Sequence, residues 1–400
     1  MNQAREICPG VYWTGVKNPD LQVFDELFPT RQGTTYNAYL VKGKDKTALI
    51  DTVKEEFSDE YFDILSSLIG TEKIDLVVVN HTEPDHTGAL EELVRRHPEI
   101  EIYCTRAADN FLKQLIDIPL KTQVVAEGDE IDLGGRTLRF ILAPNLHWPD
   151  TMFTYLPEEE ILFSCDAFGA HFCGDGLYDD EVGDFSGEYR FYFDTIMRPF
   201  KEKIREAVSK VVSLPIRLVC PSHGPLRRQG AKESIDGYAR MAAPPADEGL
   251  RALTLTLSPH GNTRTMAAAV RRGLEEFGIK VVELALYEAK EGEIRDELEQ
   301  ADALLMATPT INRDAPPPVW KALSLLSTVT PRGKVAGVFG SYGWSGEAVK
   351  LVEDRLAGLK YTLPEEGIHF RFKPTEADVQ ACQEFGRKIG RYLIEHHKTD

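Results

Sequence analysis

The sequence predicts an α/β protein built from two domains. Its 400 residues exceed what one domain core of roughly 100 to 200 residues accommodates. The apolar periodicity is interrupted at 243–249 by APPADEG, whose two prolines, small residues and acids are typical of a linker. After this segment, strand and helix patterns alternate as in a doubly wound parallel sheet. We therefore expect a first domain over residues 1–247 and a second over 248–400.

Strands and hairpins dominate the predicted first domain. Strands are expected at 36–41, 47–51 and 74–80, and a hairpin at 131–133 and 137–141 around Gly-Gly-Arg. A helix is expected over 87–97, because its apolar residues fall on one face and Glu91 and Arg95 have the spacing of an ion pair.

The predicted second domain alternates strands and helices. Strands are expected at 252–257, 280–286, 303–308 and 334–339, and helices over 263–277, from Glu347 and from Thr375. The last helix has Asp378 three residues after Thr375, the spacing of a capping box.

Composition restricts the class of partner. Against 46 Lys and Arg stand 64 Asp and Glu, and the net charge of −18 disfavours nucleic acid and anionic membranes. The N-terminus lacks a signal peptide pattern, and no 18 apolar residues run together. The six cysteines form no CxxC pair, so we expect reduced thiols in a cytoplasmic protein, without disulfides, a rubredoxin site or an iron-sulfur cluster.

The densest group of metal-ligand side chains lies in NHTEPDH at 80–86, between a predicted strand and a predicted helix. It places two imidazoles and two carboxylates, His81, Glu83, Asp85 and His86, within six residues. So many ligands in one loop suit two metal ions better than one. Because no thiolate is present, iron or manganese competes with zinc for such a site.

Three further candidate ligands each follow an apolar run that predicts a strand. They are His147, Asp166 and His223. Alone, a histidine or aspartate at a strand end is usually a turn residue with a satisfied hydrogen bond. Together with the loop, they complete four imidazoles and three carboxylates, enough for two ions with a bridging carboxylate and open positions.

This set resembles the metallo-β-lactamase superfamily, whose motif HxHxDH is followed by a later histidine, aspartate and histidine. Glu83 stands where hydrolases of that fold carry histidine, and its harder oxygen lowers selectivity for zinc. The HxExDH variant, followed by a flavodoxin-like half, resembles the flavodiiron proteins over nearly the whole chain. The resemblance implies an N-terminal metallo-β-lactamase-like αβ/βα sandwich and a flavodoxin-like doubly wound parallel sheet.

The resemblance also implies a role for each ligand in a diiron centre. One iron would be held by His81, Glu83 and His147, the other by Asp85, His86 and His223, and Asp166 would bridge them. Asp51, in the segment LIDT at 49–52, would orient a ligand histidine without touching the metal.

Three loops that follow predicted strands of the second domain form a candidate FMN site. The segment 258–263 opens a helix, so that its amides and hydroxyls converge on a point suited to a phosphate. The segments 308–312 and 340–346 resemble the loops that enclose a flavin ring, and Pro259 removes one amide donor, which lowers the expected flavin affinity. The candidate residues are Ser258, His260, Gly261, Asn262, Thr263, Thr308, Pro309, Thr310, Ile311, Asn312, Gly340, Ser341, Tyr342, Gly343, Trp344, Ser345 and Gly346.

Electron counting predicts the activity. A pair of ferrous ions and a fully reduced flavin together store the four electrons that take dioxygen to two waters, and two electrons convert two nitric oxide molecules to nitrous oxide. We therefore predict an oxidoreductase that reduces dioxygen, nitric oxide or both. His171 and Tyr192 are candidates for donating a proton or a hydrogen bond to bound oxygen, and a structural role accounts for either equally well.

The resemblance implies partners as well. A head-to-tail homodimer would place the flavin of one subunit beside the irons of the other, and a tetramer is an open alternative. The electron donor would be a rubredoxin or a reduced deazaflavin. Two other classes of protein stay open, a metal-dependent hydrolase with an appended flavodoxin domain and an electron carrier that uses FMN only. Iron, zinc or no stoichiometric metal would distinguish the three.

Overall fold

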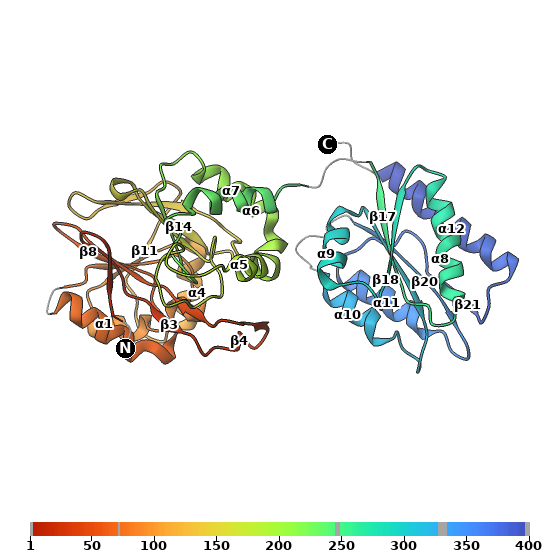
Figure 1. Ribbon diagram of the computed structural model, residues 1–400, viewed down its shortest axis with the longest axis horizontal. Helices are drawn as coiled ribbons and strands as arrows, with labels where there is room; N and C mark the ends of the chain where they lie inside the picture. Colours follow the sequence, from red (N-terminus) through yellow and green to blue (C-terminus); the bar gives the residue numbers. More distant parts are fainter. Residues whose placement is uncertain (1–2, 71–72, 245–248, 327–333, 397–400) are drawn as a thin grey trace. The chain divides into compact units, whose positions relative to one another are not determined.

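The computed structural model describes residues 3–70, 73–244, 249–326 and 334–396, and it divides into two compact units, Met1–Ala243 and Pro244–Asp400 (Figure 1). The boundary expected between residues 247 and 248 lies outside the described residues. None of the described helices combines the length and the apolar character that a membrane span needs.

Unit 1 holds two sheets. The first has the strand order β1 (Arg5–Cys8), β2 (Val11–Trp13), β7 (Tyr39–Lys42), β8 (Thr47–Ile50), β9 (Leu76–Val79), β10 (Glu101–Cys104) and β11 (Thr122–Val124). The second has the order β12 (Glu130–Asp132), β13 (Thr137–Leu142), β14 (Met152–Leu156), β15 (Ile161–Cys165) and β16 (Leu218–Pro221). Two short ladders pair β3 (Val16–Asn18) with β6 (Thr34–Tyr36) and β4 (Val23–Phe24) with β5 (Phe28–Pro29).

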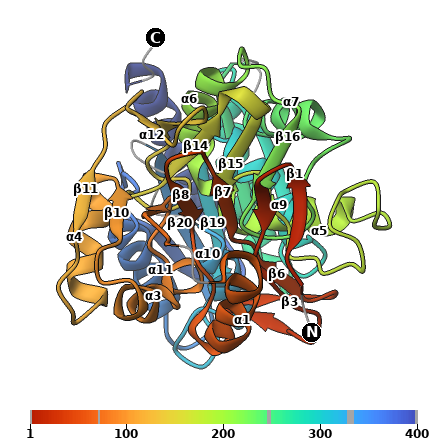
Figure 2. The same ribbon diagram turned by 90° about the vertical axis from the view of Figure 1, so that its left-hand side faces the viewer.

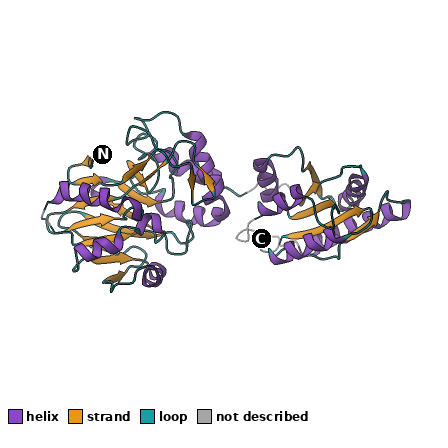
Figure 3. Ribbon diagram, turned by 90° about the horizontal axis from the view of Figure 1, so that it is seen from below, coloured by secondary structure: helices purple, strands orange, loops and turns teal. Residues whose placement is uncertain are grey.

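Helices cover the outer faces of these sheets (Figures 2 and 3). The helices that connect strands of the first sheet are η1 (Glu55–Phe57), α1 (Ser58–Ile69), α2 (Pro84–Thr87), α3 (Leu90–Arg96) and α4 (Arg106–Leu115). Those that connect or follow strands of the second sheet are η2 (Pro157–Glu159), α5 (Ser186–Tyr192), the π-helical turn η3 (Phe193–Met197), η4 (Arg198–Phe200), α6 (Lys201–Val211) and α7 (Ala231–Met241). One apolar cluster lies under α1, α3 and α4, a second between the sheets, and a third under α6 and α7. This is the expected αβ/βα sandwich.

Two expected elements of unit 1 are interrupted. The strand expected at 36–41 breaks after Tyr36, because the Asn37 side chain donates hydrogen bonds to the carbonyls of Pro221 and Gly224, at 2.8 and 2.9 Å. The helix expected over 87–97 begins only at Leu90. At Gly88 the chain packs so closely on the backbone of Glu55 that a Cβ would lie 2.2 Å from its nitrogen.

Unit 2 is a five-stranded parallel sheet in the order β18 (Lys280–Ala285), β17 (Arg251–Thr256), β19 (Ala303–Pro309), β20 (Val335–Tyr342) and β21 (Ile368–Arg371). Helices α8 (Asn262–Glu275) and α12 (Glu376–His396) cover one face, and α9 (Glu291–Gln300), α10 (Pro317–Ser324) and α11 (Glu347–Gly358) cover the other (Figure 1). The predicted doubly wound sheet is confirmed. Its strand order reverses between β17 and β19, where such sheets bind ligands.

The capping box expected at the start of α12 is present. Thr375 donates to the Asp378 carboxylate from its backbone and its hydroxyl, both at 2.8 Å, and the Asp378 amide donates back to the hydroxyl at 3.2 Å. These bonds satisfy amides that the first turn of a helix leaves without partners.

Candidate metal centre and flavin loops

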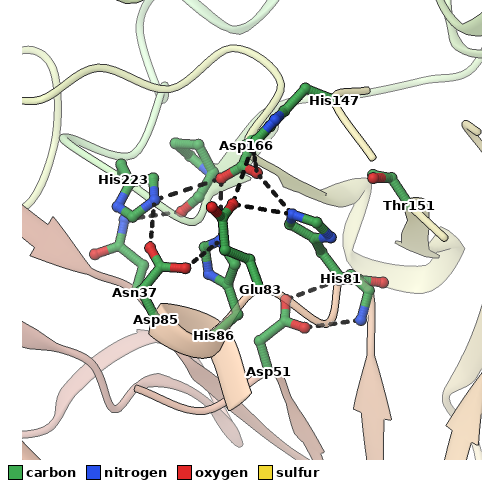
Figure 4. A network of polar contacts seen from close by, with 12 residues as sticks. Asn37, Asp51, His81, Glu83, Asp85, His86, His147, Thr151, Asp166 and His223 are labelled. Atoms are coloured by element: carbon green, nitrogen blue, oxygen red, sulfur yellow. Dashed lines mark hydrogen bonds and ion pairs between the residues drawn. The ribbon is translucent and has the colours of Figure 1, made fainter. Parts of the chain in front are cut away.

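The seven candidate ligands converge although they span positions 81 to 223 (Figure 4). Four follow β9 directly, and the others come from the segments after β13, β15 and β16. The strand β9 is completely buried and begins at Leu76, so its end delivers the ligand loop into the interior of unit 1. Five of the seven side chains are less than one-tenth exposed, and Glu83 and His147, at 15% and 20%, form the more accessible side.

One oxygen of Asp166 faces a first set of ligands. Its Oδ2 lies 3.7 Å from Nε2 of His81 and 3.4 Å from Nε2 of His147. The same two nitrogens lie 3.2 and 3.1 Å from Oε2 of Glu83. Two imidazoles and two carboxylates therefore point at one small volume.

The other oxygen of Asp166 faces a second set. Its Oδ1 lies 3.2 Å from Nε2 of His86 and 3.4 Å from Nε2 of His223. Asp85 completes this set, with Oδ1 3.4 Å from the His86 nitrogen and Oδ2 3.2 Å from the His223 nitrogen. His86 is close enough to the first set to belong to either group. Asp166 thus lies between the two sets, one oxygen toward each.

The cluster fits a pair of cations. Both carboxylate oxygens of Asp85 and Asp166 and Nε2 of His86 are buried without a hydrogen-bond partner among the described residues. Leaving such groups unpaired costs about 1–3 kcal/mol for each group, and metal coordination would satisfy these five atoms. Nitrogen and oxygen donors without thiolate suit iron as well as zinc.

The electrostatics of the cluster without metal support this fit. Burial lowers the pKa of His81, but hydrogen bonds to Asp150 and Glu83 outweigh it and raise that pKa to about 10. Burial raises the pKa of Asp166, but the imidazoles of His86 and His147 outweigh it and hold that pKa well below its usual range. Raised pKa values of His81, His86 and His147 therefore let protons on these rings balance the carboxylates where metal cations otherwise would.

Contacts outside the cluster orient two of the histidines. Asp150 is completely buried, and its Oδ2 accepts hydrogen bonds from the Thr82 amide at 2.7 Å and the Thr82 hydroxyl at 2.8 Å, and lies 3.2 Å from Nδ1 of His81. On the other side, Nδ1 of His223 donates to the carbonyl of Thr35 at 2.7 Å. Each bond leaves the Nε2 of its ring directed at the cluster.

The orienting role expected for Asp51 was wrong. Its two oxygens accept hydrogen bonds from the amide and the side chain of Asn80, at 2.7 and 3.1 Å. Asp51 therefore holds the backbone at the end of β9, and Asp150 contacts the histidine. Asp150 was not predicted from the sequence, although an acidic residue three positions after the candidate ligand His147 indicated it.

His171 and Tyr192 border the second set of ligands. The His171 ring lies 5.2 Å from that of His223 and 4.9 Å from that of Tyr192, and its Nδ1 is 3.0 Å from the hydroxyl of Thr34. Burial holds the pKa of His171 well below its usual value and the pKa of Tyr192 well above, so the first is neutral and the second is protonated. Nε2 of His171 is buried without a partner.

The three candidate flavin loops follow three neighbouring strands of unit 2, β17, β19 and β20. In the first loop, Gly261 has φ +82° and open space where a Cβ would lie, and it precedes α8 without a side-chain cap. The first turn of α8 carries no acidic residue. One amide of this turn, that of Arg264, donates to the Ser258 hydroxyl at 3.0 Å. The positive dipole of the helix end fits an anionic phosphate.

Two aromatic residues of the third loop differ in their surroundings. The Tyr342 ring is packed, with the ring of His369 at 5.3 Å and Gly346 so close that a Cβ there would lie 3.2 Å from it. Trp344 is 71% exposed. Trp344 is therefore the aromatic face of this loop that is free to cover a flat ring.

The chain resembles known proteins over both units. The family described as ODP family beta lactamase matches residues 34–224, and the flavodoxin family matches residues 255–386. The Type A flavoprotein fprA of Rhodobacter capsulatus is 39% identical over 97% of this chain and 91% of its own. The nitric oxide reductase of Moorella thermoacetica is 38% identical over 99% of this chain and 100% of its own.

Solved structures agree with these relatives. The flavodiiron protein from Giardia intestinalis matches with a TM-score of 0.69 and 29% identity, over 99% of this chain and 98% of its own. Rubredoxin oxygen:oxidoreductase from Desulfovibrio gigas matches with a TM-score of 0.71 and 28% identity, over 98% and 99%. Fold and site thus define a β-lactamase-like domain with a cluster of candidate metal ligands, followed by a flavodoxin domain. The chain belongs to the flavodiiron protein family, and it is an oxidoreductase.

Proposed function

We propose that the protein reduces dioxygen to water, nitric oxide to nitrous oxide, or both, at two irons in unit 1 that FMN in unit 2 recharges. His81, Glu83 and His147 would hold one iron, Asp85, His86 and His223 the other, and Asp166 would bridge them. A bound iron pair supplies a template for the gas and two of the electrons. The observation that carries this proposal is Asp166, whose two oxygens face two separate ligand sets.

The residues of the chain would serve the reaction in three ways. Asp150 and the Thr35 carbonyl fix the rings of His81 and His223, so little reorganisation is needed when metal binds. Three carboxylates balance the cationic charge within a buried site. The ring of neutral His171 lies 5.2 Å from that of His223, and its Nε2 has no hydrogen-bond partner among the described residues. It would offer a hydrogen bond to the bound gas, with Thr34 at its other nitrogen.

Metal and flavin analysis tests the proposal first. Two irons and one FMN per chain support it, zinc supports a hydrolase of the same fold, and flavin without stoichiometric metal supports an electron carrier. Anaerobic single turnover of the reduced protein with dioxygen and then with nitric oxide, under one donor, would establish the preference. Reduced rubredoxin and a reduced deazaflavin are the donors to compare. Iron-loaded, flavin-loaded protein that consumes neither gas would refute the proposal.

The dimer in this proposal pairs the flavin edge of one subunit with the metal centre of the other. Exposed apolar side chains at that edge follow the ends of four strands of unit 2: Tyr287, Ile311, Trp344 and Phe372. In unit 1, the hairpin of β4 and β5 exposes Val23 and Leu27, while its Phe24 ring lies 4.1 Å from that of His171. An apolar surface beside each of the two sites supports their association.

Light scattering on sized fractions tests this arrangement. Tyr287→Ser with Phe372→Ser should shift the protein toward monomer, slow turnover and weaken FMN binding, while iron is retained. The matched control is Leu351→Ser with Ile394→Ser, two exposed apolar residues on α11 and α12, which should leave the dimer intact. A monomeric wild-type protein with full activity would rule out the dimer.

A further inference from the structure

Ser341, near the end of β20, contacts both of the other flavin loops. Its Oγ lies 3.0 Å from Oγ1 of Thr263 in the first turn of α8. Its carbonyl accepts a hydrogen bond from the amide of Thr310 at 3.1 Å. Both hydroxyls are buried, with Thr263 1% and Ser341 8% exposed. A polar contact at this depth connects the phosphate-facing helix end to the ring-facing loop.

The hydroxyl pair has two possible directions. A hydroxyl carries one proton and two lone pairs, so Thr263 either donates to Ser341 or accepts from it. Only when Ser341 donates is the Thr263 proton left for another acceptor. Thr263 lies in the first turn of α8, which contains no acidic residue and in which the Arg264 amide donates to the Ser258 hydroxyl at 3.0 Å. An anion at this end would take the Thr263 proton and so fix Ser341 as the donor.

We propose that Ser341 is a positioning residue for the phosphate of FMN, acting through Thr263. Its hydroxyl donates to Thr263 and thereby directs the Thr263 hydroxyl toward the phosphate. Ser341 itself does not contact the phosphate, so it contributes to the recognition of FMN but not of riboflavin, which lacks the phosphate. This inference rests on the proposed FMN site.

Titration of the flavin-free full-length protein with FMN and with riboflavin, followed by flavin fluorescence, tests it. Ser341→Ala should weaken FMN binding roughly fivefold, the size of one ordinary hydrogen bond, and change riboflavin binding less than about twofold. Ser341→Cys, with a weaker donor of similar size, should fall between wild type and Ser341→Ala. Adding Ser341→Ala to Thr263→Val should cause no further loss of FMN affinity, because the residue through which Ser341 acts is already gone.

Thr310→Val is the matched control. The Thr310 hydroxyl accepts a hydrogen bond at 3.3 Å from the amide of Ala348, which belongs to α11 and not to α8. Loss of the Thr310 hydroxyl should weaken the binding of FMN and of riboflavin by the same factor, as a purely structural role requires. Equal weakening of both flavins by Ser341→Ala, or additive losses in the double variant, would overturn the inference. Wild-type protein that binds no FMN would instead overturn the proposed function.

Discussion

Replacing Asp150 with asparagine should loosen the metal on the His81 side of the centre. One oxygen of Asp150 accepts two hydrogen bonds from Thr82 and faces Nδ1 of His81. Asparagine keeps the shape but loses the charge, so the bond to the imidazole falls to roughly half its strength. Changes of this kind cost about 10–100-fold in metal affinity, or about 1.4–2.8 kcal/mol.

Iron release to a chelator, counted per chain against time, measures the effect. In Asp150→Asn one iron should leave at least about tenfold faster than in wild type, and the other at the wild-type rate. Asp51→Asn is the control, because Asp51 is as deeply buried but bonds to Asn80. It should lower the unfolding temperature without selective loss of iron. Two irons retained in Asp150→Asn, or selective loss in Asp51→Asn, would refute this reasoning.

Four further outcomes are expected. His147→Ala or Asp166→Ala should abolish reduction of both gases while FMN stays bound, as absorbance and turnover would show; near wild-type rates would mean that the site is misplaced. Metal affinity should rise with pH from 6 to 9, because the pKa of His81 and of His147 is about 10 without metal and each imidazole must lose a proton to bind the metal. Proton release when iron is added, measured with an indicator dye, checks this. Gly340→Ala should destabilise unit 2 by about 2 kcal/mol or more, seen in thermal unfolding, because its Cβ would lie 1.8 Å from the Thr308 carbonyl oxygen. Diluting the protein until the dimer dissociates should release FMN before iron, and simultaneous loss would contradict the proposed dimer.

The sequence indicated the candidate ligands that the structure brings together, because local signals mark their positions. His81 and His86 lie in a loop between a β-branched run and a helix, and Asp166 directly follows a fully buried strand. Those signals say that a side chain lies at a strand end. They do not say that the two oxygens of Asp166 face different ligand sets, because that depends on how the two sheets of unit 1 pack.

Elements and contacts without a local signal were missed. Helix α9 buries only Ile294 of its ten residues among those described, so its apolar periodicity is too weak to predict a helix. Asp150 lies in an irregular segment between β13 and β14, where neither period nor turn chemistry indicates the direction of a side chain. Asp51 carried the stronger pattern, an acid at the end of a strand, yet its carboxylate satisfies the Asn80 amide.

The two sites differ in how completely the chain builds them. The candidate metal ligands lie in unit 1, and bonds to Asp150 and Thr35 hold the rings of His81 and His223. The candidate flavin loops contact one another through Ser341, but Trp344 is 71% exposed, and the apolar side chains at the ends of the other strands are exposed as well. A flavin ring bound there would keep one edge in water unless another surface covered it. Burying that edge at a dimer interface would favour both the binding of FMN and the association of the subunits. FMN affinity should therefore depend on the dimer, whereas iron affinity should depend on the single chain.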